Sequence, residues 1–196
     1  MNNSLSYSGA PDISRTGVLT ALAKCLARNE YNDQLTLLAL IDLHNFSQIN
    51  QRFGYAIGDR ILAELQERLT DVPNNPLCCR RVDGDKFALI ISPLMNRQLV
   101  PLVAKKIFDQ LSRLFFVDNQ AAAIEGSIGF AAAGGPEGIV ASAETMLQNA
   151  EAAAKKAHQA GQPYHLGEVS APQQAHHQIA LKQKIARALA NNSFEL

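Results

Sequence analysis

The chain has 196 residues, of which 47% are hydrophobic and 18% are charged, and its formal net charge at pH 7 is zero. This length and composition predict one substantial α/β domain with short appendages, and they exclude a largely disordered chain. The sequence has no basic face for a nucleic acid, no apolar stretch long enough for a membrane and no secretory signal, so we expect a cytoplasmic protein. Its three cysteines include two adjacent ones and no CxxC pair, which predicts buried reduced thiols rather than a disulfide framework or a zinc site.

Residues 1–12 are rich in Asn, Ser and Gly, so we expect a linker there and a folded domain that begins near Ile13. Apolar residues at helical spacing predict a first helix over 16–26. The near-continuous apolar run over 35–42 is typical of a strand buried on both faces, and it ends in Asp42. Because ligands of open α/β sheets bind at the carboxyl ends of strands, Asp42 is a candidate functional residue.

Two helices are predicted next, a short one over 46–53 that is closed by Gly54 and a longer one that follows Asp59. Two β-type runs, 77–82 and 87–91, come after these helices, and the Asp-Gly pair between the runs predicts a tight hairpin turn. The turn would display Asp83, Gly84, Asp85 and Lys86.

The second half of the chain continues the alternation of helices and strands. We expect helices over 98–114 and 141–160, and strands over 122–131 and 164–169. A last helix over 174–190 is predicted to pack its apolar stripe on a neighbour. That stripe consists of Leu181, Ile185 and Leu189.

Several motifs in fixed register make the chain resemble the GGDEF family of diguanylate cyclases over nearly all of 13–169. Residues 42–59, DLHNFSQINQRFGYAIGD, resemble the family pattern D-x-D-x-F-K-x-x-N-D-x-x-G-H-x-x-G-D. Residues 81–87, RVDGDKF, resemble R-x-G-G-D/E-E-F. The segments 127–131 and 150–161 resemble the family motifs S-I-G-x-A and A-D-x-A-L-Y-x-A-K-x-x-G-R.

The resemblance implies an α/β fold of the nucleotide-cyclase, palm-like kind: a central mixed sheet of about five strands flanked by helices, with a β-hairpin that carries the GGDEF turn. In that family two protomers each hold one GTP, and Mg²⁺ ions on carboxylates activate a 3′-hydroxyl for phosphoryl transfer. Asp42 and Asp85 match the family's metal ligands. Asn50 and Asp59 match the residues that bind the guanine edge. The residues alone also allow other interpretations. Asp42 and Asp85 could be strand-end or turn carboxylates without a function, and Asn50 and Asp59 could be helix caps.

The turn departs from the family pattern at two positions that matter for metal and phosphate binding, Asp83 and Lys86. Asp83 replaces a glycine and adds a negative charge where a phosphate should approach, and two like charges about 4 Å apart cost roughly 4 kcal/mol at an effective dielectric near 20. Lys86 replaces a metal-binding glutamate, and an ammonium cannot bind Mg²⁺. We therefore expect no functional catalytic residue in the turn from Asp83 to Phe87. The Lys86 ammonium is expected to stand in for a metal among the three aspartates, unless it points to solvent.

Other family contacts are also missing from the sequence. The family's two lysines and one arginine for the triphosphate are replaced by Ser47, His158 and Gln162, so phosphate loses three cationic partners. The inhibitory RxxD motif would fall at 74–77 and is absent, which predicts that no inhibitory cyclic di-GMP site exists.

Residues 178–196 resemble the opening of an EAL phosphodiesterase domain, although an ordinary C-terminal helix is also compatible with them. We therefore predict a linker over 1–12, a degenerate GGDEF domain over 13–170, and a linker helix over 171–196 that leads into a truncated EAL domain. The expected function is regulatory and without catalysis, with GTP, an adjacent EAL domain or another signalling protein, and a second copy of the chain as candidate partners. No cofactor is required, and Mg²⁺ is expected only with bound GTP. The alternatives are a weakly active diguanylate cyclase and a GTP sensor.

Overall fold

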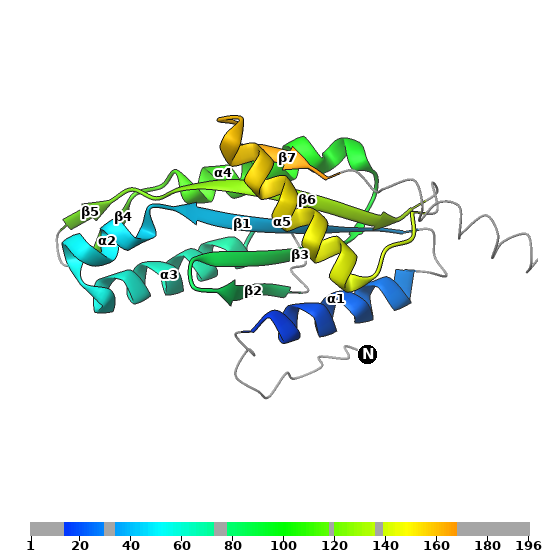
Figure 1. Cartoon of the computed structure of the whole chain (residues 1–196), viewed down its shortest axis with the longest axis horizontal. Helices are drawn as coiled ribbons and strands as arrows, with labels where there is room; N and C mark the ends of the chain where they lie inside the picture. The colour runs from blue at the N-terminus through cyan, green and yellow to red at the C-terminus, as the bar shows by residue number, and fades with distance from the viewer. Residues whose placement is uncertain (1–13, 30–33, 73–77, 118–119, 136–138, 168–196) are drawn as a thin grey trace, which may run out of the picture.

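The structure is a computed structural model, and it describes residues 14–29, 34–72, 78–117, 120–135 and 139–167. The predicted linker over 1–12, the 74–77 segment and the C-terminal helix lie outside these residues. Figure 1 shows a twisted central sheet with helices packed against both of its faces. None of the described helices is both long and apolar enough to cross a membrane.

The sheet has five strands in the order β2-β3-β1-β6-β7. Its central strand β1 (Leu35–His44) pairs antiparallel with β3 (Lys86–Leu94) on one side and with β6 (Glu125–Gly134) on the other. The edge strand β2 (Cys78–Asp83) forms a hairpin with β3, and β7 (Tyr164–Leu166) runs parallel to β6. The mixed five-stranded sheet predicted from the sequence is confirmed.

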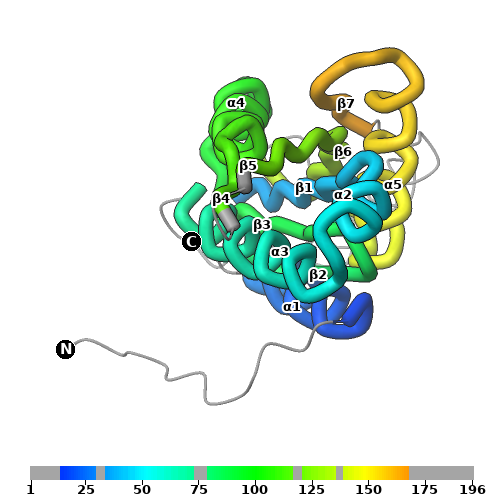
Figure 2. The backbone as a smooth tube through the Cα atoms, turned by 90° about the vertical axis from the view of Figure 1, so that its left-hand side faces the viewer, coloured from blue at the N-terminus to red at the C-terminus, as the bar shows by residue number. Residues whose placement is uncertain are grey.

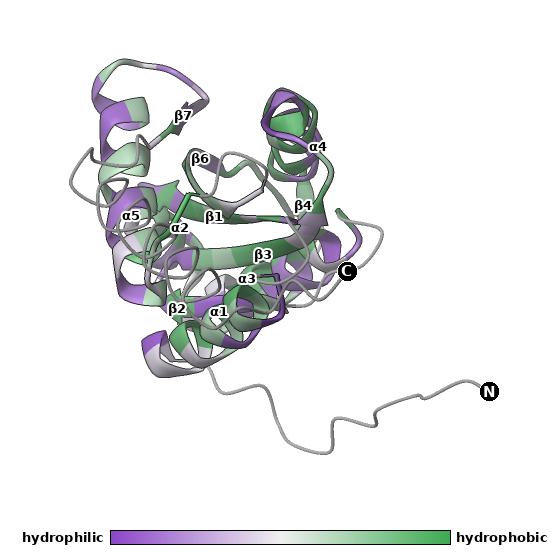
Figure 3. Ribbon diagram, turned by 90° about the vertical axis from the view of Figure 1, so that its right-hand side faces the viewer, coloured by the Kyte–Doolittle hydropathy of each residue, from purple (hydrophilic) through white to green (hydrophobic). Residues whose placement is uncertain are grey.

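The sheet lies between two pairs of helices (Figure 2). Helices α1 (Arg15–Asn29) and α5 (Ala143–Gln159) cover one face, and α3 (Tyr55–Thr70) and α4 (Val100–Leu111) cover the other. Successive residues of β1 point to opposite faces, so its apolar run supplies both cores at once. Figure 3 shows the hydrophobic strands β1 and β3 enclosed between the helices.

Two helices follow β1, as predicted from the sequence, but the second helix begins earlier than expected. Helix α2 (Phe46–Phe53) ends at Gly54, whose φ of +85° suits a glycine. Helix α3 begins at the next residue, Tyr55, so Asp59 lies inside the helix instead of before it. The helix-cap interpretation of Asp59 is therefore wrong.

A small two-stranded sheet, β4 (Phe115–Val117) with β5 (Gln120–Ala122), was not predicted. The helix expected over 98–114 instead begins with a 3₁₀ turn, η1 (Arg97–Leu99), and ends with α4 at Leu111. Phe115 is fully buried and has the Arg68 guanidinium 3.9 Å from its ring centre, whereas Phe116 is 69% exposed. This alternation fits a strand and not a fourth turn of helix.

The thiol prediction is confirmed for Cys25, which is buried, but Cys79 is only half-buried. A buried polar cluster connects α1 to the sheet in the same region of the fold. The Asn29 Nδ2 donates to Thr36 Oγ1 at 2.7 Å and to Ser92 Oγ at 2.6 Å. These bonds satisfy polar groups that would otherwise destabilise the core.

Helix α5 packs unusually closely on β6, and this contact places the second half of α5 beside the end of β1. A Cβ on Gly129 would lie 2.0 Å from the Ala150 carbonyl oxygen and 2.3 Å from the Ala154 nitrogen. Both neighbours are backbone atoms, which cannot move away as a side-chain tip can. Glycine at position 129 is therefore a steric requirement of the α5–β6 contact.

We predict that Gly129→Ala lowers the free energy of unfolding by about 3 kcal/mol or more, because overpacking against a rigid backbone is among the costlier core substitutions. Thermal and urea denaturation measure this change. Gly161→Ala is the matched control, since its φ is +62° but no atom lies within 4 Å of the added methyl group. The control is expected to cost about 1 kcal/mol, and equal losses in both variants would contradict the packing argument.

Candidate functional site

An open cleft of about 900 Å³ lies at the carboxyl end of β1, between the β2–β3 hairpin and the second half of α5. The start of α1 closes one side of it. Ionisable side chains dominate its lining and carry both signs of charge. They are Arg15, Asp42, His44, Asp83, Lys86, Glu151, Lys155 and His158.

The β1–β3 pairing brings the predicted metal ligand and the substituted turn together. Asp42 and Lys86 are direct partners across the antiparallel pair, and the Leu43 N–H donates to the Asp85 carbonyl at 3.2 Å. The turn between the hairpin strands has Gly84 at a φ of +44°, which glycine adopts without strain. The sequence-predicted residues Asp42, Asp83 and Lys86 thus line one cleft, and Asp85 lies next to it.

Asp42 is partly buried, and its electrostatics are set by the neighbouring hairpin. Burial raises the pKa of the Asp42 carboxyl above its ordinary value, because the charged form loses hydration. The Lys86 ammonium acts in the opposite direction and lowers this pKa, whereas Asp85 raises it further. Lys86 therefore interacts with Asp42 through space as a counter-ion.

Two histidines that the sequence analysis did not single out as a pair meet at the cleft. The rings of His44 and His158 have centroids 4.1 Å apart at an interplanar angle of 59°. The His44 Nε2 is buried and has no hydrogen-bond partner among the described residues. His44 stands at the second Asp of the D-x-D pattern, so comparison with that pattern could have identified it. Burial, and then His158, lower the pKa of His44.

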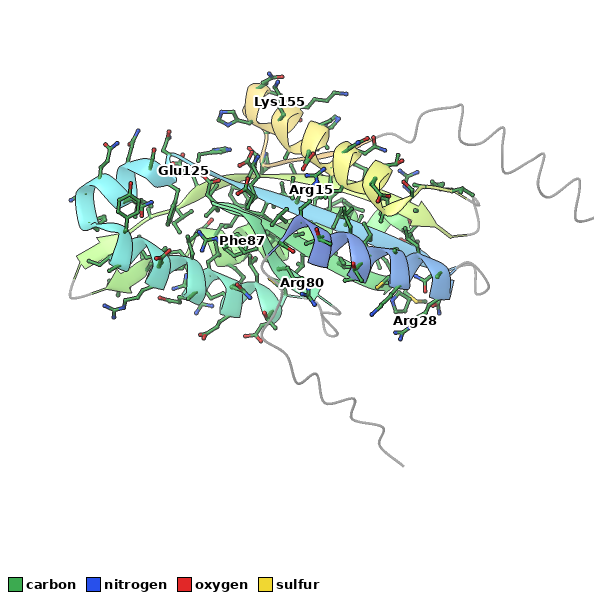
Figure 4. The ribbon with its side chains drawn as sticks, turned by 60° about the horizontal axis from the view of Figure 1, so that its bottom comes forward. Arg15, Arg28, Arg80, Phe87, Glu125 and Lys155 are labelled. Carbon is green, nitrogen blue, oxygen red and sulfur yellow. The ribbon has the colours of Figure 1, made fainter. Side chains whose placement is uncertain are left out.

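Two cationic residues that were not expected from the sequence also line the cleft. Arg15, at the start of α1, forms an ion pair with Glu151 of α5. Lys155 lies one turn further along α5, is exposed and also lines the cleft. Figure 4 shows Arg15 at the start of α1 and Lys155 on α5. Lys155 occupies the aromatic position of the family motif A-D-x-A-L-Y, a departure that is visible in the sequence. Arg15 has no such signal.

The two guanine-edge candidates are not among the residues that line the cleft. Asp59 is exposed on α3, and its Oδ1 lies 4.0 Å from Nη1 of Arg81 on β2. The Arg81 Nε donates to the Gly84 carbonyl, so Arg81 connects Asp59 to the turn. Asn50 packs its amide against Gly58, where a Cβ would meet the Asn50 Oδ1 at 1.9 Å. Their role in binding a nucleotide stays a prediction.

The family's Mg²⁺ requires a nearly octahedral set of oxygen ligands. Asp42 and Asp85 offer carboxylates, but the direct strand partner of Asp42 is the ammonium of Lys86. In the part of the chain that the structure describes, no three His, Cys, Asp or Glu side chains are grouped to hold a metal ion. The residues present do not fit a Mg²⁺ site of the kind that the family implies.

The three residues that replace the family's cationic phosphate contacts do not all lie at the cleft. His158 lines the cleft, whereas Ser47 and Gln162 do not. Of the three replacements, only His158 is placed to meet a ligand in this cleft.

A family model and curated relatives indicate the same protein family for this chain. The family model described as "Diguanylate cyclase, GGDEF domain" matches residues 13–163. The chain is 32% identical over 85 residues to the diguanylate cyclase DgcP of Escherichia coli, and 35% identical over 68 residues to the diguanylate cyclase TpbB of Pseudomonas aeruginosa. These matches cover 43% and 35% of this chain, and the chain spans only 24% and 15% of the length of the two relatives.

Solved structures agree with the fold. The GGDEF domain of TpbB from Pseudomonas aeruginosa superposes with a TM-score of 0.72 at 22% identity, covering 80% of this chain and 97% of that one. An EAL/GGDEF domain protein from M. capsulatus superposes with a TM-score of 0.64 at 30% identity, covering 76% of this chain and 94% of that one.

The lowered pKa of His44 predicts a pH-dependent stability. The unfolded chain takes up this proton near the ordinary pKa of 6.5, and the folded chain takes it up only at a lower pH. Stability that depends on neutral His44 is therefore complete above pH 6.5 and is lost as the pH falls toward the folded-state pKa. We expect the melting temperature to fall less in His44→Gln than in the parent between about pH 7.5 and about pH 5.5.

His165→Gln serves as the control, because His165 lies on β7 and does not line the cleft. Its melting temperature should follow the parent through the same pH range. An unchanged pH dependence in His44→Gln would show that burial of this imidazole does not contribute.

Proposed function

The chain belongs to the GGDEF family of diguanylate cyclases, and from this premise we propose that it is a catalytically inactive member with a regulatory role in cyclic di-GMP signalling. The position of Lys86 carries the proposal. Lys86 replaces the family's glutamate and stands directly opposite Asp42 across the β1–β3 pair. A general base is worth about 10²- to 10⁴-fold in rate, and an ammonium in its place also repels the metal.

Asp83 supports the same conclusion from the other side of the turn. Its side chain lines the cleft where the family has a glycine. An additional carboxylate there opposes the approach of a polyphosphate. Two independent substitutions therefore act against metal-assisted phosphoryl transfer.

We propose that the domain acts on an adjacent EAL domain or on another signalling protein, as a monomer or as a homodimer. One of the similar structures comes from a protein described as an EAL/GGDEF domain protein, which supports an EAL neighbour. The matched segments make up only 15% and 24% of the two curated relatives, so in those proteins the matched region is one part of a longer chain.

GTP is the ligand that we propose for the regulatory role, with Asn50 and Asp59 as the residues that recognise guanine. Arg81 lies between Asp59, at 4.0 Å, and the Gly84 carbonyl of the turn, which is compatible with a nucleotide that extends from α3 toward the cleft. Mg²⁺ at Asp42 and Asp85 is not required for this role.

The second candidate is a weakly active diguanylate cyclase. Asp42, Asp85, Asn50 and Asp59 are all retained, and Asp42 lies two residues before the carboxyl end of β1, at the position that matches the family's metal ligand. A restored turn, Asp83→Gly with Lys86→Glu, separates the two candidates.

We predict that the parent protein forms no detectable cyclic di-GMP from GTP and Mg²⁺, and that the restored double variant forms it at least about 100-fold faster than any residual rate of the parent. Chromatographic detection of cyclic di-GMP measures both. The single variant Lys86→Glu is the control for the contribution of Asp83. Sustained turnover by the parent protein would reject the inactive assignment in favour of the second candidate.

We further predict that Asp59→Ala weakens GTP binding about 10- to 100-fold, because a charged hydrogen bond to the guanine edge is worth about 1.5 to 3 kcal/mol. Isothermal titration calorimetry measures this loss, and inorganic pyrophosphate, which has no base, should bind the parent and the variant equally. If GTP binds both proteins with the same affinity, Asp59 does not recognise the base.

A further inference from the structure

The charges of the cleft fall into two classes according to whether they already have a partner. Arg15 and Glu151 neutralise each other in a direct ion pair. Lys86 and Lys155 also line the cleft, but neither forms an ion pair with a described carboxylate. Lys86 acts on Asp42 only through space, so both ammonium groups keep hydrogen-bond donors for an anion, and their attraction must outweigh the repulsion from Asp83 in the same lining.

The two lysines approach the cleft from opposite walls. Lys86 comes from the hairpin side, where the strand register holds it opposite Asp42. Lys155 comes from α5, whose position is fixed by the close packing of Ala150 and Ala154 on Gly129. An anion that contacts both ammonium groups would accept charge-assisted hydrogen bonds, which are roughly twice as strong as neutral ones.

From this arrangement we infer that the cleft binds the phosphate groups of a nucleotide without a divalent metal, with Lys86 and Lys155 as built-in cations in place of Mg²⁺. The inference rests on the proposed nucleotide-binding role and specifies how that same site holds its ligand. It follows from the poor fit of Mg²⁺ to a cleft whose candidate metal ligand already faces an ammonium. Lys155 replaces an aromatic residue of the family motif and supplies a cation at a new position.

A lysine-based site responds to Mg²⁺ in the opposite sense to a metal-based site. Mg²⁺ in solution binds phosphate oxygens and reduces their negative charge, so it competes with the two ammonium groups. In a metal-based site the same ion is part of the binding surface and increases affinity. The sign of the Mg²⁺ effect therefore distinguishes the two arrangements.

The test is a calorimetric titration of the full chain with GTP and with inorganic pyrophosphate, once in EDTA and once in excess MgCl₂. We expect both ligands to bind in EDTA and Mg²⁺ to leave the affinity unchanged or to lower it. Guanosine is titrated alongside, to separate binding of the base from binding of the phosphates. Binding that appears only with Mg²⁺, or no binding of either phosphate at millimolar concentration, would overturn the inference.

The matched variants are Lys155→Gln and Lys156→Gln. Both lysines are exposed on α5, but only Lys155 lines the cleft. We expect Lys155→Gln to weaken pyrophosphate binding about tenfold and Lys156→Gln to leave it within about twofold. Equal losses would assign the binding to general surface charge and reject the site.

Lys86→Glu supplies a second, independent check, with its melting temperature measured to confirm folding. It should abolish pyrophosphate binding in EDTA, and binding that persists there unchanged would contradict the role of Lys86. Cyclic di-GMP formation by the parent protein would overturn the inactive assignment alone. The titrations in EDTA decide the mode of phosphate binding whether or not that assignment holds.

Discussion

The antiparallel register between β1 and β3 is the constraint on which the rest of the site depends. It places Lys86 directly opposite Asp42 and, through the bond from Leu43 to Asp85, fixes the hairpin turn at the end of the central strand. Because β1 is buried between two helical layers, a one-residue slip would exchange its two apolar faces, so the register is strongly specified. The core packing therefore decides which side chain faces Asp42 across the strand pair, and in this chain that side chain is Lys86.

Much of the fold could be predicted because local patterns are strong at the elements that matter. The apolar run of β1 and the Asp-Gly turn each have few alternative structures, and both were found where expected. Phe115 shows why other elements could not be predicted. Its burial under Arg68 is a tertiary contact, and without it the segment has a pattern compatible with the end of the preceding helix.

The site was predicted less completely, for a related reason. Asp42, Asp83 and Lys86 lie in or next to one hairpin and its neighbouring strand, so a motif in fixed register locates them. Arg15 reaches the cleft only because α1 and α5 cover the same face of the sheet, and no local pattern reports that proximity. Lys155 is visible as a departure from a family motif, but the motif alone does not show that it lines the cleft. The substitutions Ser47, His158 and Gln162 remove three cations of the family motif, but they do not account for Arg15 and Lys155, which also line the cleft. Cations missing from the motif are partly replaced by cations at other positions.

The central claim is that an ammonium occupies the place of the family's metal in this cleft. The most direct measurement is a crystal structure with GTP and Mn²⁺, with the ion located by its anomalous scattering. The account predicts no anomalous peak between Asp42 and Asp85, and a ligand phosphate in contact with Lys86. Two manganese ions that bridge an ordered triphosphate at the turn would contradict it.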